Sequence, residues 1–353
     1  PDPDHLGACF SAHYQDGESL YILGGMGYSS TSEAFGTFPY LTIVDVPMVI
    51  DAVINERAAG FYFQQVEHAS FAVMEASLSK VKNEFFLVGG RKIAGDFDQS
   101  GDLQMNESFI NEIASFQLIE EAETLEIINF KTIDYTDDFQ HAHASYIPQI
   151  FPDGEPGLTI FQNEKVEDIN KLSWLNAFDF GYSSYTLTEA SLAHYHSTFI
   201  PVYDTKNNTM HNLLLGGCDD YYCSDEIEYA PYQIEELVDV SRSSDGKVAV
   251  NNYKIQQYLA KGRNALFLLD EHTPTLENGI IDLNQLKKER NFIGYIYGGS
   301  TTPSPMFFND GSVWDKAVNQ LFKVYLINSE NSTHPLGVLY PNKNKNHYTI
   351  YIE

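Results

Sequence analysis

The chain has little positive charge, few cysteines and no long apolar run. Its 353 residues include 21 Lys and Arg against 49 Asp and Glu, which gives a formal net charge of −28 at pH 7. An excess of carboxylates of this size repels the phosphates of nucleic acids and the surfaces of anionic lipids. We therefore expect no nucleic-acid partner. The charge either attracts cations or simply forms a solvated acidic surface.

Membrane and export signals are also missing from the sequence. No stretch approaches the roughly 18 consecutive apolar residues that a membrane-spanning helix needs. No basic-then-apolar leader precedes Pro1. We expect a soluble chain, processed or trimmed, with no part inserted in a membrane.

Three common catalytic signatures are absent. The sequence has no GxSxG nucleophile elbow, no phosphate-binding loop and no dinucleotide fingerprint, because its glycine pairs precede loops and strands instead of helices. Carboxylate pairs for glycoside hydrolysis cannot be selected among 49 acidic residues, since their separation in space is the diagnostic feature.

Only three cysteines are present. Cys218 and Cys223 flank one short loop and are expected to close a disulfide ring, whereas Cys9 lies in the strand-like run Ala-Cys-Phe and is expected to be buried. Together with glycosylation sequons at Asn106 and Asn207 (a third is at Asn331), this usage favours an oxidising, extracellular compartment.

Glycine pairs, in contrast, recur along the whole chain. Four apolar segments end in Gly-Gly: LYILGG (20–25), FFLVGG (85–90), NLLLGG (212–217) and GYIYGG (294–299). Their first glycines are 65, 127 and 82 residues apart, and the middle interval holds a degenerate copy, LTIFQ (158–162). A unit that recurs at this length indicates an array of similar modules.

Each unit contains four candidate β-strands. A short motif opens the inner strand, and it reads HASF (68–71), HASY (143–146) and HSTF (196–199), with GACF (7–10) and NALF (264–267) as variants. Turns rich in Gly, Asn and Asp join it to the glycine strand. A polar loop, a third run such as PYLTIVDV and a fourth such as LEIINF follow. Four antiparallel strands repeated about five times predict meander blades that pack in a ring.

This pattern resembles the kelch-type β-propellers over nearly the whole chain. The resemblance implies an all-β, kelch-like propeller of four-stranded antiparallel blades, with five blades expected and six as the alternative if part of the N-terminus is missing. The units span about residues 5–66, 67–138, 139–192, 193–258 and 259–340. The sequence departs from the family at Gln162 and Asn163, where glycines are expected, in its longer units, and in lacking a fourth-strand tryptophan.

The tail after the last strand, YPNKNKNHYTI (340–350), resembles the start of the C-terminal sorting domain of the bacterial type IX secretion system, with Lys343 in place of a second proline. This resemblance implies a secreted or cell-surface parent protein from a Bacteroidetes-like bacterium. Residues 341–353 are then the start of such a domain, or a linker.

One acidic segment matches the calcium loop of an EF-hand. Oxygen-bearing side chains stand at loop positions 1, 3, 5, 9 and 12, with glycine at position 6. A calcium ion needs about six to eight oxygens converging around one sharp turn. The expected ligands are Asp96, Asp98, Ser100, Asp102, Gln104 and Glu107. The flanking residues favour strands, so the alternative is a solvated acidic loop.

A histidine set recurs at one position of the repeat. His68, His143 and His196 are expected at the start of inner strands in three successive blades, near one mouth of the central channel. Three converging imidazoles could bind zinc or copper. Alternatively, each histidine holds the neighbouring blade by hydrogen bonds.

The second-to-third-strand loops of a meander emerge on the same face as the blade-to-blade connections. Long loops follow Gly25, Gly90, Gly217 and Gly299, whereas an insert at about 271–290, with DLNQLKKER as a possible helical turn, is expected on the opposite face. Binding residues accumulate in such loops. The aromatics expected there are Tyr28, Phe35, Tyr221, Tyr222, Phe307 and Trp314.

These features favour a secreted or cell-surface binding module for a protein or a glycan, with calcium stiffening one loop. It is expected as a monomer or as part of a larger surface assembly. The propeller resemblance also implies an alternative, a carbohydrate-active or metal-dependent enzyme with its site at the channel mouth. A third possibility is a structural spacer in a larger adhesin.

Overall fold

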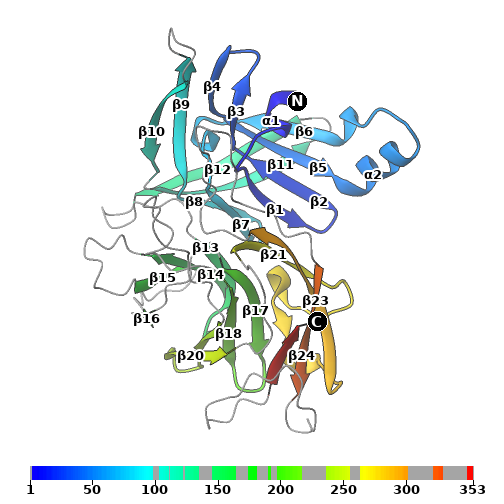
Figure 1. The fold of residues 1–353 in the computed structure, drawn as a ribbon, viewed down its shortest axis with the longest axis vertical. Helices are drawn as coiled ribbons and strands as arrows, with labels where there is room; N and C mark the ends of the chain where they lie inside the picture. The colour runs from blue at the N-terminus through cyan, green and yellow to red at the C-terminus, as the bar shows by residue number, and fades with distance from the viewer. Residues whose placement is uncertain are drawn as a thin grey trace. The chain divides into compact units, whose positions relative to one another are not determined.

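The computed structural model describes residues 2–97, 103–110, 112–121, 124–134, 145–163, 174–180, 190–191, 197–216, 236–254, 263–300, 321–328 and 348–352. The chain divides into two compact units, Pro1–Tyr146 and Ile147–Glu353 (Figure 1). Both consist mainly of antiparallel sheets in which strands close in sequence lie side by side.

The first sheet of unit one has the order β1-β2-β5-β6. Its strands are β1 (Ala12–Asp16), β2 (Ser19–Leu23), β5 (Tyr40–Asp45) and β6 (Phe63–Glu67). Gly17, with φ of +57°, provides the left-handed residue that the tight β1–β2 turn requires. Tyr21 and Leu23, two residues apart, are both buried, so one face of the sheet contributes to the core.

Two short α-helices accompany the first sheet. α1 (Pro3–Leu6) precedes β1, and α2 (Val46–Ile54) with the 3-10 helix η1 (Gly60–Tyr62) connects β5 to β6. The Asp45 carboxylate caps α2 by accepting a hydrogen bond of 3.0 Å from the Met48 N–H. The helix α2 was not predicted, because VPMVIDAVI is apolar almost throughout and a short apolar run fits a strand as well as a helix.

The second sheet has the order β12-β11-β8-β7. The 3-10 helix η2 (Ala69–Phe71) leads into it, and its strands are β7 (Ser77–Val81), β8 (Glu84–Val88), β11 (Glu112–Glu121) and β12 (Thr124–Asp134). The first and second sheets share one apolar core in which Phe71 and Phe116 are fully buried. Phe85 stacks on Phe116 with centroids 5.4 Å apart. Burying each such ring stabilises the unit by about 1.5–3 kcal/mol.

Unit one also contains an additional sheet, at the positions where long loops were expected. The strands β3 (Met26–Ser29), β4 (Ala34–Thr37), β9 (Arg91–Phe97) and β10 (Leu103–Phe109) pair in the order β10-β9-β4-β3. The hairpin β3-β4 follows Gly25, and β9-β10 follows Gly90. Connections from two neighbouring repeats therefore join into one four-stranded sheet, which we call the accessory sheet (Figure 1).

Unit two contains three further sheets. The third sheet is β13 (Ser145–Ile150), β14 (Pro156–Asn163), β15 (Trp174–Phe180) and β16 (Ala190–Ser191). The fourth contains β17 (Thr198–Asp204), β18 (Thr209–Leu215), β19 (Glu236–Arg242) and β20 (Val248–Lys254). The fifth is β21 (Arg263–Leu269), β23 (Arg290–Ser300), β24 (Leu321–Asn328) and β25 (Tyr348–Ile352).

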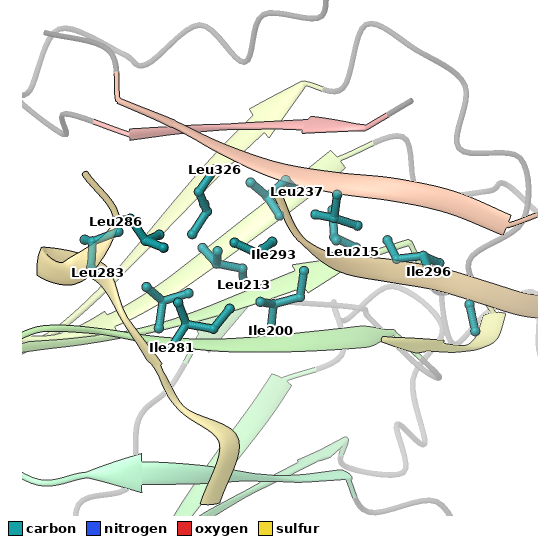
Figure 2. Close-up of a cluster of buried hydrophobic side chains, with 13 residues drawn as sticks. Ile200, Leu213, Leu215, Leu237, Ile281, Leu283, Leu286, Ile293, Ile296 and Leu326 are labelled. Carbon is teal, nitrogen blue, oxygen red and sulfur yellow. The ribbon is translucent and has the colours of Figure 1, made fainter. Parts of the chain in front are cut away.

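The fourth and fifth sheets share an apolar core (Figure 2). Ile200 and Leu213 come from the fourth sheet, and Ile293 and Leu326 from the fifth. Between the third and fourth sheets a buried amide pair joins the neighbours, because Gln149 Nε2 donates to Asn212 Oδ1 over 2.7 Å.

The insert expected near 271–290 lies against the fourth sheet. It forms the 3-10 helix η5 (Glu277–Gly279), the short strand β22 (Ile281–Asp282) and the 3-10 helix η6 (Leu283–Gln285). β22 pairs in parallel with β17, and Ile281 and Leu283 enter the core of Figure 2. The predicted helical turn in DLNQLKKER is thus a single 3-10 turn.

The structure confirms the predicted third strands and places several other segments differently. The run PYLTIVDV contains β5, and the runs NEIASFQLI, NKLSWLNAF, YQIEELVDV and NQLFKVYLI overlap β11, β15, β19 and β24, which each extend one or two residues further. Within the segment expected to be a tail, β25 pairs with β24, so the fifth sheet extends beyond residue 340. The prediction that Cys9 is buried is wrong: Cys9 is exposed and makes only an isolated bridge to Met26, because the left-handed Phe10 follows it before β1 begins.

Candidate functional site

The glycine pairs place the connections that follow them. Gly24 and Gly25 have φ of +65° and +86°, and Gly89 and Gly90 have φ of +63° and +89°. A Cβ on Gly24 would lie 2.2 Å from the carbonyl oxygen of Val73, and the Gly25 N–H donates to that oxygen over 2.7 Å. Glycine is needed because the backbone is left-handed and the next segment passes directly against it.

The accessory sheet brings two predicted aromatics together with residues from the other repeat. Tyr28 pairs with Phe35, Phe35 with Gly95 and Gly95 with Met105. Residues directly opposite in antiparallel strands share a face, so the four form one row across the sheet. Tyr28 is 50% and Met105 53% exposed, while Phe35 is half-buried. We call these three side chains the apolar row.

The face of β3 opposite Tyr28 is packed. A Cβ on Gly27, which neighbours Tyr28 and points to the opposite face, would lie 3.0 Å from the Phe38 ring. On the face of the apolar row, Ile93 at the base of the sheet is buried, whereas Tyr28 and Met105 are exposed. The exposed part of the apolar row therefore lies away from the base of the sheet.

A charge cluster lies at the base of the accessory sheet. The Arg91 guanidinium, directly after Gly90, contacts both oxygens of Glu75, Nε at 2.7 Å and Nη2 at 2.9 Å. Its Nη1 contacts Glu107 at 2.7 Å. Burial alone would lower the Arg91 pKa, but the two carboxylates outweigh it and raise this pKa. The cluster joins the second sheet, through Glu75, to both strands of the β9-β10 hairpin.

The calcium segment forms a hairpin in place of a continuous loop. Asp96 lies opposite Gln104 in the register of β9 and β10, and Glu107 lies opposite Ile93. Glu107, the expected final calcium ligand, is held by Arg91. Asp98, Ser100 and Asp102 lie outside the described residues. The calcium site remains a prediction.

The expected histidine position is wrong for the second sheet. β7 begins at Ser77, and Glu75 stands two residues before it, the place that His143 and His196 hold before Ser145 and Thr198. The sequence signal was misleading, because HASF matches the motif whereas EASL (75–78), at the start of β7, lacks both its histidine and its aromatic.

His68 has a local structural role. Its Nδ1 accepts a hydrogen bond of 3.3 Å from the Ser70 N–H at the start of η2. Its ring lies 4.1 Å from that of Phe130, and burial lowers its pKa. His143 and His196 lie outside the described residues, so a convergent histidine site stays a prediction.

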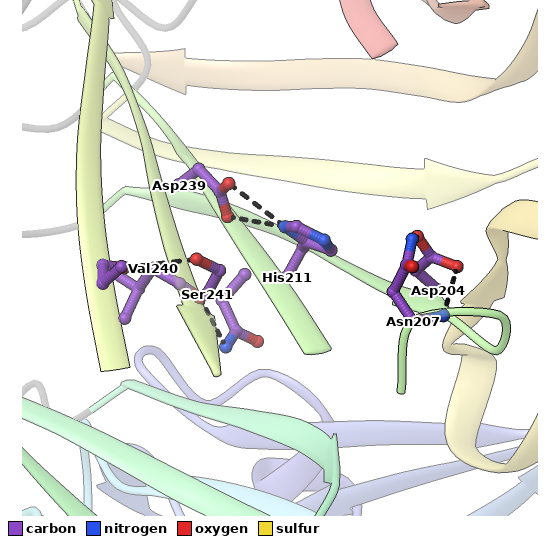
Figure 3. Close-up of polar contacts among 8 residues, drawn as sticks. Asp204, Asn207, His211, Asp239, Val240 and Ser241 are labelled. Atoms are coloured by element: carbon purple, nitrogen blue, oxygen red, sulfur yellow. Dashed lines mark hydrogen bonds and ion pairs between the residues drawn. The ribbon is translucent and has the colours of Figure 1, made fainter. Parts of the chain in front are cut away.

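In unit two, sequence reasoning missed a histidine-carboxylate pair (Figure 3). His211 Nδ1 lies 3.2 Å and 3.1 Å from the two oxygens of Asp239. Burial disfavours the imidazolium, but the Asp239 hydrogen bond and charge outweigh this and raise the His211 pKa. The carboxylate orients the ring as in a general base. Ser241, opposite His211, donates its hydroxyl to the Ala249 carbonyl instead.

A second polar group in Figure 3 closes the β17–β18 turn. The Asp204 carboxylate accepts hydrogen bonds from the Lys206 N–H and from Asn207, whose Nδ2 lies 2.6 Å away. Burial raises the Asp204 pKa, but these hydrogen bonds prevail and lower it. Asn284 of the insert accepts from the same Lys206 N–H. This group is structural.

Several predicted residues cannot be placed. Tyr221, Tyr222, Phe307, Trp314, Cys218 and Cys223 lie outside the described residues. Sequence reasoning also missed Met105, Gly95 and Arg91; their only signal is their place after a glycine pair. Among the described residues, no three His, Cys, Asp or Glu side chains converge as metal ligands, and no helix there is long and apolar enough to cross a membrane.

Comparisons with known proteins give little beyond this geometry. No family model matches the chain, and no curated protein matches it. A solved structure described as "Structure of YjhT" is similar, with 12% sequence identity and a TM-score of 0.48, over 98% of this chain and 84% of that chain.

Proposed function

We propose that the five four-stranded meanders form a kelch-type, five-bladed β-propeller and that the chain is a secreted or cell-surface binding module for a protein or a glycan. The strand order within each repeat and the shared glycine geometry support the propeller. Repeats of this kind bury their faces by packing against the next repeat.

One observation carries the binding function. The accessory sheet is built from the connections of two neighbouring repeats and carries the exposed Tyr28 and Met105 side chains in one row. Exposed apolar groups that lie together on a rigid support are typical of binding surfaces. Aromatic and Met side chains can stack on a sugar or anchor a protein partner.

Calcium and export complete the proposal. The acidic residues of the β9–β10 connection would hold calcium and stiffen the hairpin that carries Met105. The tail resemblance supports export through the type IX system.

The test compares the wild type with a Tyr28→Ala/Met105→Ala double variant on a glycan array and in pull-down from culture supernatant. We expect a glycan or protein ligand that the double variant no longer binds. The control is Phe61→Ala, because Phe61 is 88% exposed and lies in the β5–β6 connection, at the opposite end of the first sheet from Gly24. No ligand in either assay, or equal loss in the control, would overturn the proposal.

A further inference from the structure

The apolar row contains a gap. Gly95 lies between Phe35 and Met105 in the register, and it has no side chain. Adjacent strands are about 4.8 Å apart, so the two flanking side chains stand about 10 Å apart over bare backbone. A gap of this width admits one apolar side chain of a partner. We call it the Gly95 gap.

Acidic groups lie on both sides of the apolar row along the strand direction. At the tip of the β3-β4 hairpin, Glu33 is exposed, and the Asp4 carboxylate accepts hydrogen bonds from the Ser30 N–H and hydroxyl. At the base, Glu107 follows Met105 by two residues on the same face. Rows two residues apart are about 7 Å apart, within reach of a lysine side chain centred on the gap.

The positive charge on the face of the apolar row is already neutralised. Arg91 contacts both Glu75 and Glu107, and Lys92, the other cation of β9, alternates to the opposite face. Asp4, Glu33, Glu75 and Glu107 are four carboxylates against Arg91 and Lys92, a local net charge of −2. The whole chain, at −28, adds an attraction for cations at longer range.

We propose that the accessory sheet binds a basic polypeptide segment, with one aromatic or branched apolar side chain in the Gly95 gap and lysine or arginine side chains beside Glu33 and Glu107. This inference rests on the proposed binding function and names its ligand class. A neutral glycan would use the apolar row but gain nothing from the carboxylates, whereas a basic segment is complementary to both features.

The probe is a seven-residue peptide that alternates lysine with valine around a central tryptophan, and its counterpart has glutamate in place of lysine. Binding is measured by isothermal titration calorimetry. We expect the basic peptide to bind at least about tenfold more tightly than the acidic one, and to weaken severalfold as NaCl rises from about 0.05 to 0.5 M, because exposed charges are screened. Equal affinities for the two peptides would overturn the inference.

Two substitutions test whether the Gly95 gap itself binds the peptide, or whether any added leucine in β9 lowers the affinity. Gly95→Leu fills the Gly95 gap and should weaken the basic peptide about tenfold. Gly95 does not have a positive φ, so leucine suits its backbone. Ala94→Leu places the same side chain one residue away, at an exposed position on the opposite face, and should leave affinity unchanged. If both substitutions changed the affinity for the basic peptide equally, the Gly95 gap would not be the binding site.

The charge is tested in the same way. Glu33→Gln should weaken the basic peptide about two- to fivefold, while Glu56→Gln, exposed after α2, should not. If an array glycan binds through Tyr28 and Met105 but the basic peptide does not bind, the inference fails and the proposed function stands. If no ligand depends on those two residues, both fail.

Discussion

The backbone N–H of Glu75 donates a hydrogen bond of 2.9 Å to the carbonyl oxygen of Phe10, and the two residues hold the same place in consecutive repeats. Phe10 has φ of +59° and Glu75 of +56°. Each turns the chain into an inner strand, Ala12–Asp16 and Ser77–Val81. The repeats therefore meet at a strained backbone position beside the glycine pairs. Such strain, about 1–3 kcal/mol per residue, persists only where the surrounding structure requires it.

The close approach at the glycine pairs predicts a large difference between two similar substitutions. Gly24→Ala and Gly17→Ala both place a Cβ at positive φ, +65° and +57°. At Gly17 nothing lies within 4 Å, whereas at Gly24 the Val73 oxygen lies at 2.2 Å. We expect Gly17→Ala to lower the free energy of unfolding by about 1 kcal/mol and Gly24→Ala by about 3 kcal/mol or more. Urea unfolding followed by circular dichroism measures both, and equal losses would contradict the steric argument.

The Arg91 cluster predicts that lysine cannot replace this arginine. Lysine is a point charge and cannot contact both oxygens of Glu75 while also reaching Glu107. We expect Arg91→Lys to destabilise unit one by about 1–2 kcal/mol, because the Glu75 side chain is only 10% exposed.

Arg57→Lys is the matched control for that prediction. Arg57 pairs with Asp51, but their side chains are 51% and 49% exposed. A pair this exposed contributes little. We expect no measurable change in the urea midpoint. If Arg57→Lys lowered the free energy of unfolding as much as Arg91→Lys, the loss at Arg91 could not be attributed to its contacts with both Glu75 and Glu107.

Local signals in the sequence were sufficient to predict most of the strands and the presence of a repeat. Alternation and glycine pairs are features of adjacent residues, so the strands ending at Leu23 and Val88 could be recognised directly. The prediction that the inner strand of the second repeat starts at His68 was wrong, because η2 follows His68 and the strand begins only at Ser77. The segment EASL (75–78) lacks the histidine and the aromatic of the motif, so the local pattern pointed to the wrong start.

The accessory sheet could not be predicted from local patterns. Its central contact pairs Phe35 with Gly95, which belong to different repeats. The predicted aromatics Tyr28 and Phe35 were correctly placed after a glycine pair. Gly95 and Met105 become neighbours of Phe35 only when the β3-β4 and β9-β10 hairpins pair. Long-range pairing depends on the whole fold, so the site was found only in part.

His211 predicts a pH effect with a definite sign. Asp239 raises the His211 pKa above its ordinary value of about 6.5. The resulting stabilisation is complete below that value and is lost as the pH rises through the folded-state pKa. An NMR titration of the imidazole should show a raised pKa that falls in Asp239→Asn. An unchanged pKa in that variant would contradict the pairing.

His5 predicts the opposite dependence. Its ring is 1% exposed, Nδ1 lies 2.9 Å from Thr42 Oγ1, and burial lowers its pKa. Below pH of about 6.5 the unfolded chain binds a proton that the folded chain resists, so stability falls on acidification. We expect His5→Gln to show a smaller loss of unfolding free energy between about pH 7 and 5. His68, whose pKa burial also lowers, should account for part of the remaining loss.

Calcium should stabilise the wild type and leave Asp98→Ala unchanged. An ion that binds only the folded state at 100 times its dissociation constant contributes about 2.7 kcal/mol, which a thermal melt resolves. Magnesium controls for general screening, and Asn106→Ala controls for the strand, because Asn106 is an exposed residue of β10 that the site does not use. Melting temperatures that ignore calcium in every variant would rule the site out.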